Sequence, residues 1–120
     1  MRRRAPDAYR GDLLAGTLDM MILQTLRSGP AHGLFIAEQI ERRSDDVLLI
    51  EQGSLYPALH RLEDREWITS FWGVSETNRR ARFYKLTRKG RKQLTVESNR
   101  WESLARAVTR VMRPARPAGR

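Results

Sequence analysis

The chain has no cysteine and only 2 histidines among its 120 residues. The absence of cysteine excludes disulfide bonds and cysteine-based zinc sites, and nothing in the sequence requires an oxidising compartment. The motifs HExxH, GxSxG and GxxxxGK are also missing, so the sequence gives no sign of metalloprotease, serine-hydrolase or P-loop chemistry. We therefore expect no catalytic residue, no metal and no cofactor, in a protein that is not an enzyme.

Long hydrophobic runs are missing as well. The N-terminal segment MRRRAPDAYRGD is basic and polar, and the longest apolar run near it is Met20 to Leu23. A signal peptide needs an apolar segment of about 7 to 15 residues, and a membrane-spanning helix needs about 20. We therefore expect a cytoplasmic protein with no membrane partner.

Acidic residues are scarce relative to basic ones. The formal net charge is +9 and the isoelectric point is near 11.1. Such an excess of positive charge indicates a polyanionic partner such as nucleic acid. The alternative is codon usage, because most of the basic residues are arginine and a GC-rich genome favours arginine. The length and the hydrophobic fraction of 40% predict one soluble domain, small enough for a partner subunit to supply part of the burial.

The stretch that the rest of the chain is expected to hold and orient is Gly53 to Arg65, GSLYPALHRLEDR. With Ser54 as N-cap, Pro57 falls at the third helical position, where its missing N–H needs no partner. One side of this helix is apolar, and it is formed by Leu55, Leu59 and Leu62. The opposite side is polar, and it is formed by Ser54, Pro57, His60, Arg61 and Asp64. Taken alone, the pattern also fits an ordinary amphipathic surface helix.

Two shorter helices are predicted before this stretch. One runs from Thr17 to the Gly29–Pro30 stop signal, and the other covers Gly33 to Arg43. The connector that follows, Ser44 to Gly53, is either a short edge strand or a loop packed on the core. Three short helices in succession, the third with a polar front, suggest a helix-turn-helix variant.

Two strands are predicted after the third helix, Trp67 to Trp72 and Ala81 to Leu86. The basic end of this hairpin carries Arg79, Arg80 and Arg82, with no acidic residue between Glu76 and the end of the second strand. A basic hairpin directly after a helix-turn-helix is interpreted as a wing that contacts nucleic acid. The alternative is a plain exposed hairpin whose arginines have no specific partner.

A long helix is predicted from Thr87 onward. Its apolar residues follow a heptad-like seam, which is formed by Leu94, Trp101, Leu104, Val108 and Val111. Because no later element covers it, this seam predicts pairing with the same helix of a second subunit; folding back on its own domain is the alternative. The predicted organisation is a flexible arm over 1–12, a DNA-binding domain over 13–86, a dimerisation helix over 87–112 and a disordered tail over 113–120.

The order and spelling of several segments resemble the PadR family of transcriptional regulators. The matching segments are GTLDMMIL (16–23), GPAHG (29–33), GSLYPALHRLE (53–63), RRARFYKLTRKG (79–90) and the region of Trp101. The resemblance implies a fold that is mainly α with a small β-hairpin: a winged helix-turn-helix plus a long C-terminal dimerisation helix. It further implies a homodimer that binds operator DNA and usually represses genes. The chain has one helix after the wing, as in the short subtype, and Glu66 stands where the family often has glycine.

In this fold the third helix enters the major groove, and its first residues reach the base edges. That assigns the following residues to DNA: Ser54, Tyr56, Pro57, His60 and Arg61 from the helix, with Arg79, Arg80 and Arg82 from the wing. Trp101 is a candidate to stack on a small apolar or aromatic effector between the subunits, or it is plain interface core. The predicted function is a sequence-specific regulator, acting as a homodimeric repressor on an inverted repeat of double-stranded DNA. The alternative is a basic RNA-binding or non-specific nucleic-acid-binding protein.

Overall fold

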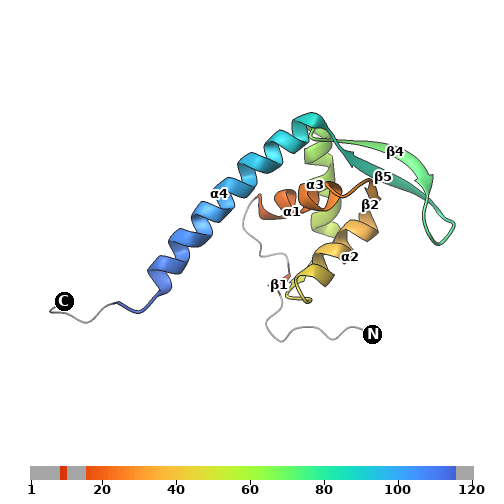
Figure 1. Ribbon diagram of the computed structural model, residues 1–120. Coiled ribbons are helices and arrows are strands. Elements are labelled where there is room, and N and C mark those ends of the chain that lie inside the picture. Colours follow the sequence, from red (N-terminus) through yellow and green to blue (C-terminus); the bar gives the residue numbers. More distant parts are fainter. Residues whose placement is uncertain (1–8, 11–15, 116–120) are drawn as a thin grey trace.

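The computed structural model describes residues 9–10 and 16–115 of the chain. The described helices and strands follow one another as shown in Figure 1: β1 (Tyr9–Arg10), α1 (Thr17–Leu26), β2 (Ala31–His32), α2 (Gly33–Arg43), β3 (Leu48–Leu49), α3 (Gln52–Asp64), β4 (Ile68–Val74), β5 (Arg80–Leu86) and α4 (Arg88–Met112). Most of the arm predicted over 1–12 and residues 116–120 of the predicted tail lie outside the described residues.

The first three helices share one apolar core, which the wing strands and the first turns of α4 complete. Each helix has apolar residues at spacings of three and four, so each buries a single side. Burying one such leucine or isoleucine side chain contributes about 1.5–3 kcal/mol, which makes this core the main source of stability. The large side chains with less than 2% exposure are Ile22, Leu23, Leu26, Ile36, Leu55, Leu59, Leu62 and Ile68.

The predicted hairpin belongs to a three-stranded antiparallel sheet in the order β2-β5-β4. The β4–β5 register runs from Ile68 opposite Leu86, next to the core, to Val74 opposite Arg80 near the tip. β2 adds two residues on the other side of β5, with Ala31 opposite Tyr84 and His32 opposite Phe83. The inner end of the hairpin is therefore fixed to the domain, while its outer end projects from it (Figure 1).

Two residues of the predicted arm form a strand. Tyr9 and Arg10 make up β1, which pairs in parallel with Leu48 and Leu49 of β3. The connector between the second and third helices therefore contains an edge strand, and its backbone groups find partners in the segment before α1. The two strands are far apart in sequence. The local composition of residues 1–12, which is polar, therefore predicted a flexible arm and gave no sign of this pairing.

The start of α3 corrects the prediction made from Ser54. The N-cap is Glu51, and the N–H groups of Ser54 and Leu55 both donate to the carbonyl of Glu51, at 3.0 and 2.9 Å. Ser54 is therefore already helical. Pro57 lies inside α3, where its missing N–H leaves the carbonyl of Gly53 without its usual helical donor. Gly53 is exposed, so water can reach that carbonyl.

The long C-terminal helix α4 begins in tight contact with the body of the domain. Thr87 is its N-cap, and the Thr87 hydroxyl accepts a hydrogen bond from Gly90 N–H at 2.9 Å. A Cβ at Gly90 would lie only 2.0 Å from the carbonyl oxygen of Trp67, so only glycine allows this approach. The C-terminal part of α4 extends away from the other elements (Figure 1). The predicted fold class, mainly α with a winged helix-turn-helix and a long C-terminal helix, is confirmed.

The C-terminal end of α3 uses a backbone conformation that normally selects glycine. Glu66 has a φ of 63°, in the left-handed region. The N–H of Glu66 donates to the carbonyl of Glu63 at 2.9 Å, and the N–H of Trp67 donates to that of Leu62 at 3.0 Å. These two bonds define a Schellman cap. The chain thus forms the glycine-type helix end with a glutamate.

We predict that Glu66→Gly raises the free energy of unfolding by about 1 kcal/mol. A left-handed residue with a Cβ costs about 1–2 kcal/mol, and part of this gain is lost to the greater freedom of glycine in the unfolded chain. The ion pair of Glu66 with Lys89, at 3.7 Å, is exposed and contributes little. Denaturant unfolding measures the change. Glu66→Ala is the control, because it removes the ion pair and keeps the Cβ; equal stability of the alanine and glycine variants would contradict the prediction.

Candidate nucleic-acid interface

Helix α3 turns its leucines inward and its predicted DNA-binding residues outward. Leu55, Leu59 and Leu62 are at most 1% exposed. On the other sides Tyr56, Pro57, His60 and Arg61 are exposed and Ser54 is half-buried. The predicted residues therefore lie on solvent-facing sides of one helix.

Tyr56 lies against the start of α2. A Cβ built on Gly33 would be 3.0 Å from the Tyr56 hydroxyl oxygen and 3.1 Å from its ring, so the absence of a side chain at Gly33 makes room for the tyrosine. Tyr56 still has 42% of its surface exposed. Its hydroxyl is thereby held beside the N-terminus of α2, and the positive end of a helix dipole favours anions.

Arg61 is not a free guanidinium. Its Nη2 donates to Oδ1 of Asp19 in α1 at 2.8 Å, and the two side chains are 50% and 14% exposed. This pair joins α1 to α3 across 42 positions of sequence. Arg61 therefore has a structural partner in addition to the base contact predicted for it.

Glu63 of α3 contacts both strands of the wing. The hydroxyl of Ser70 in β4 donates to Glu63 Oε2 at 2.6 Å, and Arg82 Nη2 in β5 lies 3.1 Å from the same oxygen. The pKa of the Glu63 carboxyl is lowered, chiefly by the Ser70 hydrogen bond; burial opposes this, and the hydrogen bond and charge of Arg82 lower the pKa further. The predicted wing residue Arg82 is thus engaged with α3, and the wing and α3 form one connected surface.

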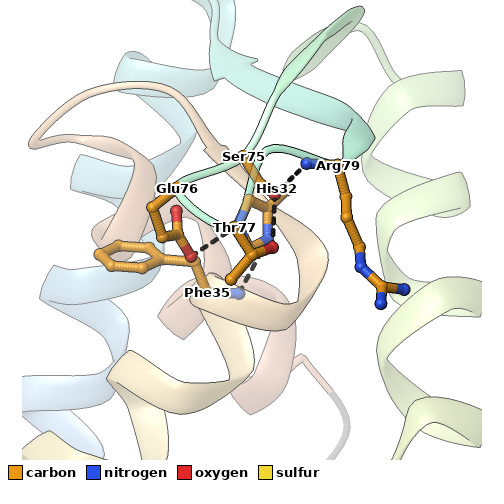
Figure 2. A network of polar contacts seen from close by, with 6 residues as sticks. All are labelled: His32, Phe35, Ser75, Glu76, Thr77 and Arg79. Carbon is orange, nitrogen blue, oxygen red and sulfur yellow. Dashed lines mark hydrogen bonds and ion pairs between the residues drawn. The ribbon is translucent and has the colours of Figure 1, made fainter.

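Arg79 and Arg80 are at the outer end of the wing, and neither forms an ion pair with a described residue. The Arg80 guanidinium lies over the ring of Trp72, 4.6 Å from its centroid, which is cation–π geometry. The backbone of Arg79 is bonded to Ser75, and its side chain extends away from the other labelled side chains in Figure 2. Both arginines are exposed.

The predicted seam of α4 divides into two parts. Leu94 is 5% exposed and belongs to the core of its own domain, so it is not available at an intersubunit seam. The other members are exposed by 41% to 80%, namely Trp101, Leu104, Val108 and Val111. Trp101 and Leu104 also line a pocket with Met20 and with Gly16 and Thr17 at the start of α1.

Several residues that organise this surface were not found by sequence reasoning. Asp19, Glu63 and His32 each have their partners in another element, so no local periodicity marks them. His32 is the last residue of β2 and the N-cap of α2. The only sequence signal for the Asp19–Arg61 pair was the position of Asp19, an acidic residue on the flank of the apolar stripe of α1.

The described part of the chain offers neither a metal site nor a membrane-spanning helix. Within 9–10 and 16–115 there is no cluster of three side chains that could hold a metal ion. In the same part of the chain, no helix has the combination of length and apolar character needed to cross a membrane.

Comparison with known proteins gives the family. Residues 22–96 match the family described as "Transcriptional regulator PadR-like family". The transcriptional regulator Rv3488 of Mycobacterium tuberculosis is 34% identical over 87 residues, which cover 72% of this chain and 78% of that protein.

Solved structures agree with this match. A transcriptional regulator from Clostridium thermocellum superposes with a TM-score of 0.76 and 29% identity, over 86% of this chain and 100% of that one. A PadR family transcription regulator from Clostridium difficile gives a TM-score of 0.70 and 26% identity, over 82% of this chain and 100% of that one. The chain therefore belongs to the PadR-like family of transcriptional regulators, which are DNA-binding proteins and not enzymes.

Proposed function

We propose that the chain is a sequence-specific repressor that binds an inverted repeat in double-stranded DNA as a homodimer, with α3 in the major groove and the wing beside it. A small apolar or aromatic effector at the Trp101 pocket would relieve repression. Family membership supports DNA binding. The sequence preference, the two-fold symmetry and the effector are inferred from the surfaces of α3, the wing and α4.

The single observation that carries the proposal is the connection through Glu63. Because one carboxylate accepts hydrogen bonds from Ser70 and Arg82, the exposed front of α3 and the basic wing keep a fixed relative position. A major-groove element and a second basic element at a fixed spacing match one face of a duplex. Tyr56 adds a hydroxyl beside the start of α2, which is suited to a phosphate.

The homodimer is supported by the exposed part of α4. Trp101, Leu104 and Val108 are between 41% and 50% exposed on a helix that extends beyond the domain. An apolar stripe of this length in water favours burial against an equivalent stripe. The two-fold axis of such a dimer would place two α3 helices on the two halves of an inverted repeat.

The effector is supported by the pocket between the start of α1 and α4. Its apolar lining comes from Met20, Trp101 and Leu104, and Glu97 and Arg100 line it as well. A flat apolar molecule could stack on the indole there. Since the pocket contacts both the proposed dimer helix and the DNA-binding domain, occupancy would couple the two.

RNA binding is the second candidate. Stacking of RNA bases on a sheet requires exposed aromatic rings. In β5, Tyr84 is 6% exposed and Phe83 is half-buried. In β4, Phe71 and Trp72 are 45% and 59% exposed, and each already has one contact, Phe71 with the Phe83 ring and Trp72 with the Arg80 guanidinium. Selection of bound sequences from a random duplex pool tests the main proposal. A second measurement compares the affinity for duplex DNA, structured RNA and single strands at one salt concentration. Enrichment of an inverted repeat is expected; equal affinity for RNA and duplex would overturn the proposal.

We predict that Arg80→Ala weakens binding to all duplex sequences alike. A phosphate contact carries no base information, so the slope of log affinity against log salt should fall by about one. Fluorescence anisotropy titrations at several salt concentrations measure both quantities. Arg80→Lys keeps the charge and loses the planar contact with Trp72, so it should retain the slope. A slope unchanged in the alanine variant would remove Arg80 from the DNA surface.

We predict that Arg61→Ala loses about 1–3 kcal/mol of binding to the selected site and relaxes preference at one base pair. Asp19→Ala is the matched variant, because it breaks the same ion pair and leaves the arginine in place. Base preference should survive in Asp19→Ala if Arg61 reads a base. If both variants lose stability equally and neither changes the selected sequence, Arg61 serves only to join α1 and α3.

We predict that Leu104→Glu converts the protein to a monomer at micromolar concentration, because it puts a charge into an apolar seam. Sedimentation velocity or light scattering measures the mass. Asn99→Glu adds the same charge about 140° around the helix axis, and it should remain dimeric. A wild-type protein that is itself monomeric would exclude the homodimer.

A further inference from the structure

His32 is buried where β2 meets α2, and its ring makes a hydrogen bond on one side. The residue is 7% exposed, and its Nδ1 accepts a hydrogen bond from the backbone N–H of Phe35 at 3.2 Å. His32 is therefore the side-chain N-cap of α2. Because Nδ1 acts as an acceptor, the neutral imidazole carries its proton on Nε2.

The second ring nitrogen faces the wing. Nε2 of His32 is closed off from solvent, and no described residue forms a hydrogen bond with it in this conformation. The nearest carboxylate oxygen is Oε1 of Glu76, 3.4 Å away, as Figure 2 shows. Glu76 belongs to the turn at the tip of the wing, and its side chain is 70% exposed. A buried N–H and a carboxylate thus meet across two elements.

The imidazole has little freedom to turn away. Its ring is edge-on to Phe35, with centroids 6.2 Å apart, and to Phe83, with centroids 5.4 Å apart. Phe83 in turn stacks on Phe71 at 5.6 Å. A Cβ at Gly73 would lie 2.9 Å from the Phe83 ring, so this side of the sheet is closely packed. The direction of Nε2 is fixed by packing as well as by the hydrogen bond to Phe35.

The turn that holds Glu76 is itself well connected. Ser75 N–H donates to the carbonyl of Arg79 at 2.8 Å, and the Ser75 hydroxyl accepts from the Arg79 N–H at 3.3 Å. The hydroxyls of Ser75 and Thr77 lie 3.0 Å apart, and Asn78 completes the turn with a left-handed φ of 61°. Glu76 and Arg79 therefore belong to one hydrogen-bonded turn (Figure 2).

We propose that His32 is a positioning residue for DNA binding: through Glu76 it holds the tip of the wing against the start of α2 and so sets where Arg79 and Arg80 meet the DNA. The contact between His32 and Glu76 is called the wing latch below. It acts at the tip of the wing, whereas Glu63 acts at its middle, so together they fix the hairpin at two points. This inference rests on the proposed function, in which the wing lies on DNA.

Three variants separate the latch from other effects. Glu76→Ala removes the carboxylate, and Glu76→Gln removes only its charge, since the amide keeps an oxygen that can face Nε2–H. This control is needed because losing a negative charge near DNA by itself favours binding. His32→Asn keeps a good N-cap for α2 and is too short to reach Glu76.

The first measurement uses the free protein and does not depend on DNA. Hydrogen exchange of the amides over 75–80 should be several-fold faster in Glu76→Ala and His32→Asn than in the wild type and in Glu76→Gln. Exchange in α1 should not change, which shows that the domain stays folded. Equal exchange over 75–80 in all four proteins would overturn the latch, whether or not the wild type binds DNA.

The second measurement is affinity for one fixed duplex at one salt concentration. Glu76→Ala should bind at least 3-fold more weakly than Glu76→Gln, and His32→Asn combined with Glu76→Ala should be no weaker than the weaker single variant. Equal affinity of the alanine and glutamine variants, with faster wing exchange in the alanine variant, would overturn the positioning role. Failure of the wild type to bind any duplex would instead overturn the proposed function, and the exchange result would still decide on the latch.

Discussion

Burial of the leucine stripe of α3 is the constraint on which the interface depends. Leu55, Leu59 and Leu62 are almost completely buried, and the stripe they form is narrow. A narrow stripe fixes the rotation of a helix about its own axis, because any turn would expose a leucine to water. The ion pair of Arg61 with Asp19 and the hydrogen bonds of Glu63 hold the two flanks of the same helix. What α3 presents to solvent is therefore decided by what it buries.

The charge of the protein is organised by a small number of acidic partners. Asp19 and Glu63 each take one arginine of the predicted surface, Arg61 and Arg82, and tie it to a neighbouring element. Arg79 and Arg80 keep their charge available at the outer end of the wing. A net charge of +9 thus contains arginines with different tasks: some join elements, while others face solvent. Composition alone cannot make that distinction, because it depends on which carboxylate folds next to which guanidinium.

Much of the fold could be predicted from the sequence, because it follows from local patterns. Each of these patterns can be recognised within a short stretch of sequence: the leucine spacing of α3, the aromatic and β-branched strands of the wing, and the apolar seam of α4. The parts that could not be predicted depend on contacts between distant segments. The pairing of β1 with β3 and the burial of Leu94 are of this kind. The start of α3 was misjudged for another reason: its N-cap Glu51 makes no side-chain bond, so Ser54 gave a stronger but wrong signal.

The close approach of Gly90 to the Trp67 carbonyl has a mechanical consequence. Trp67 directly follows the cap of α3, and the N–H of Thr87 donates to that same carbonyl at 3.0 Å. The N-terminal end of α4 is thus packed directly against the segment that ends α3. A molecule that tilted the C-terminal end of α4 would therefore act on a helix whose other end is packed tightly beside α3. Such a tilt would rotate α3 together with the rest of the domain, because the close packing around Gly90 leaves no space for local bending.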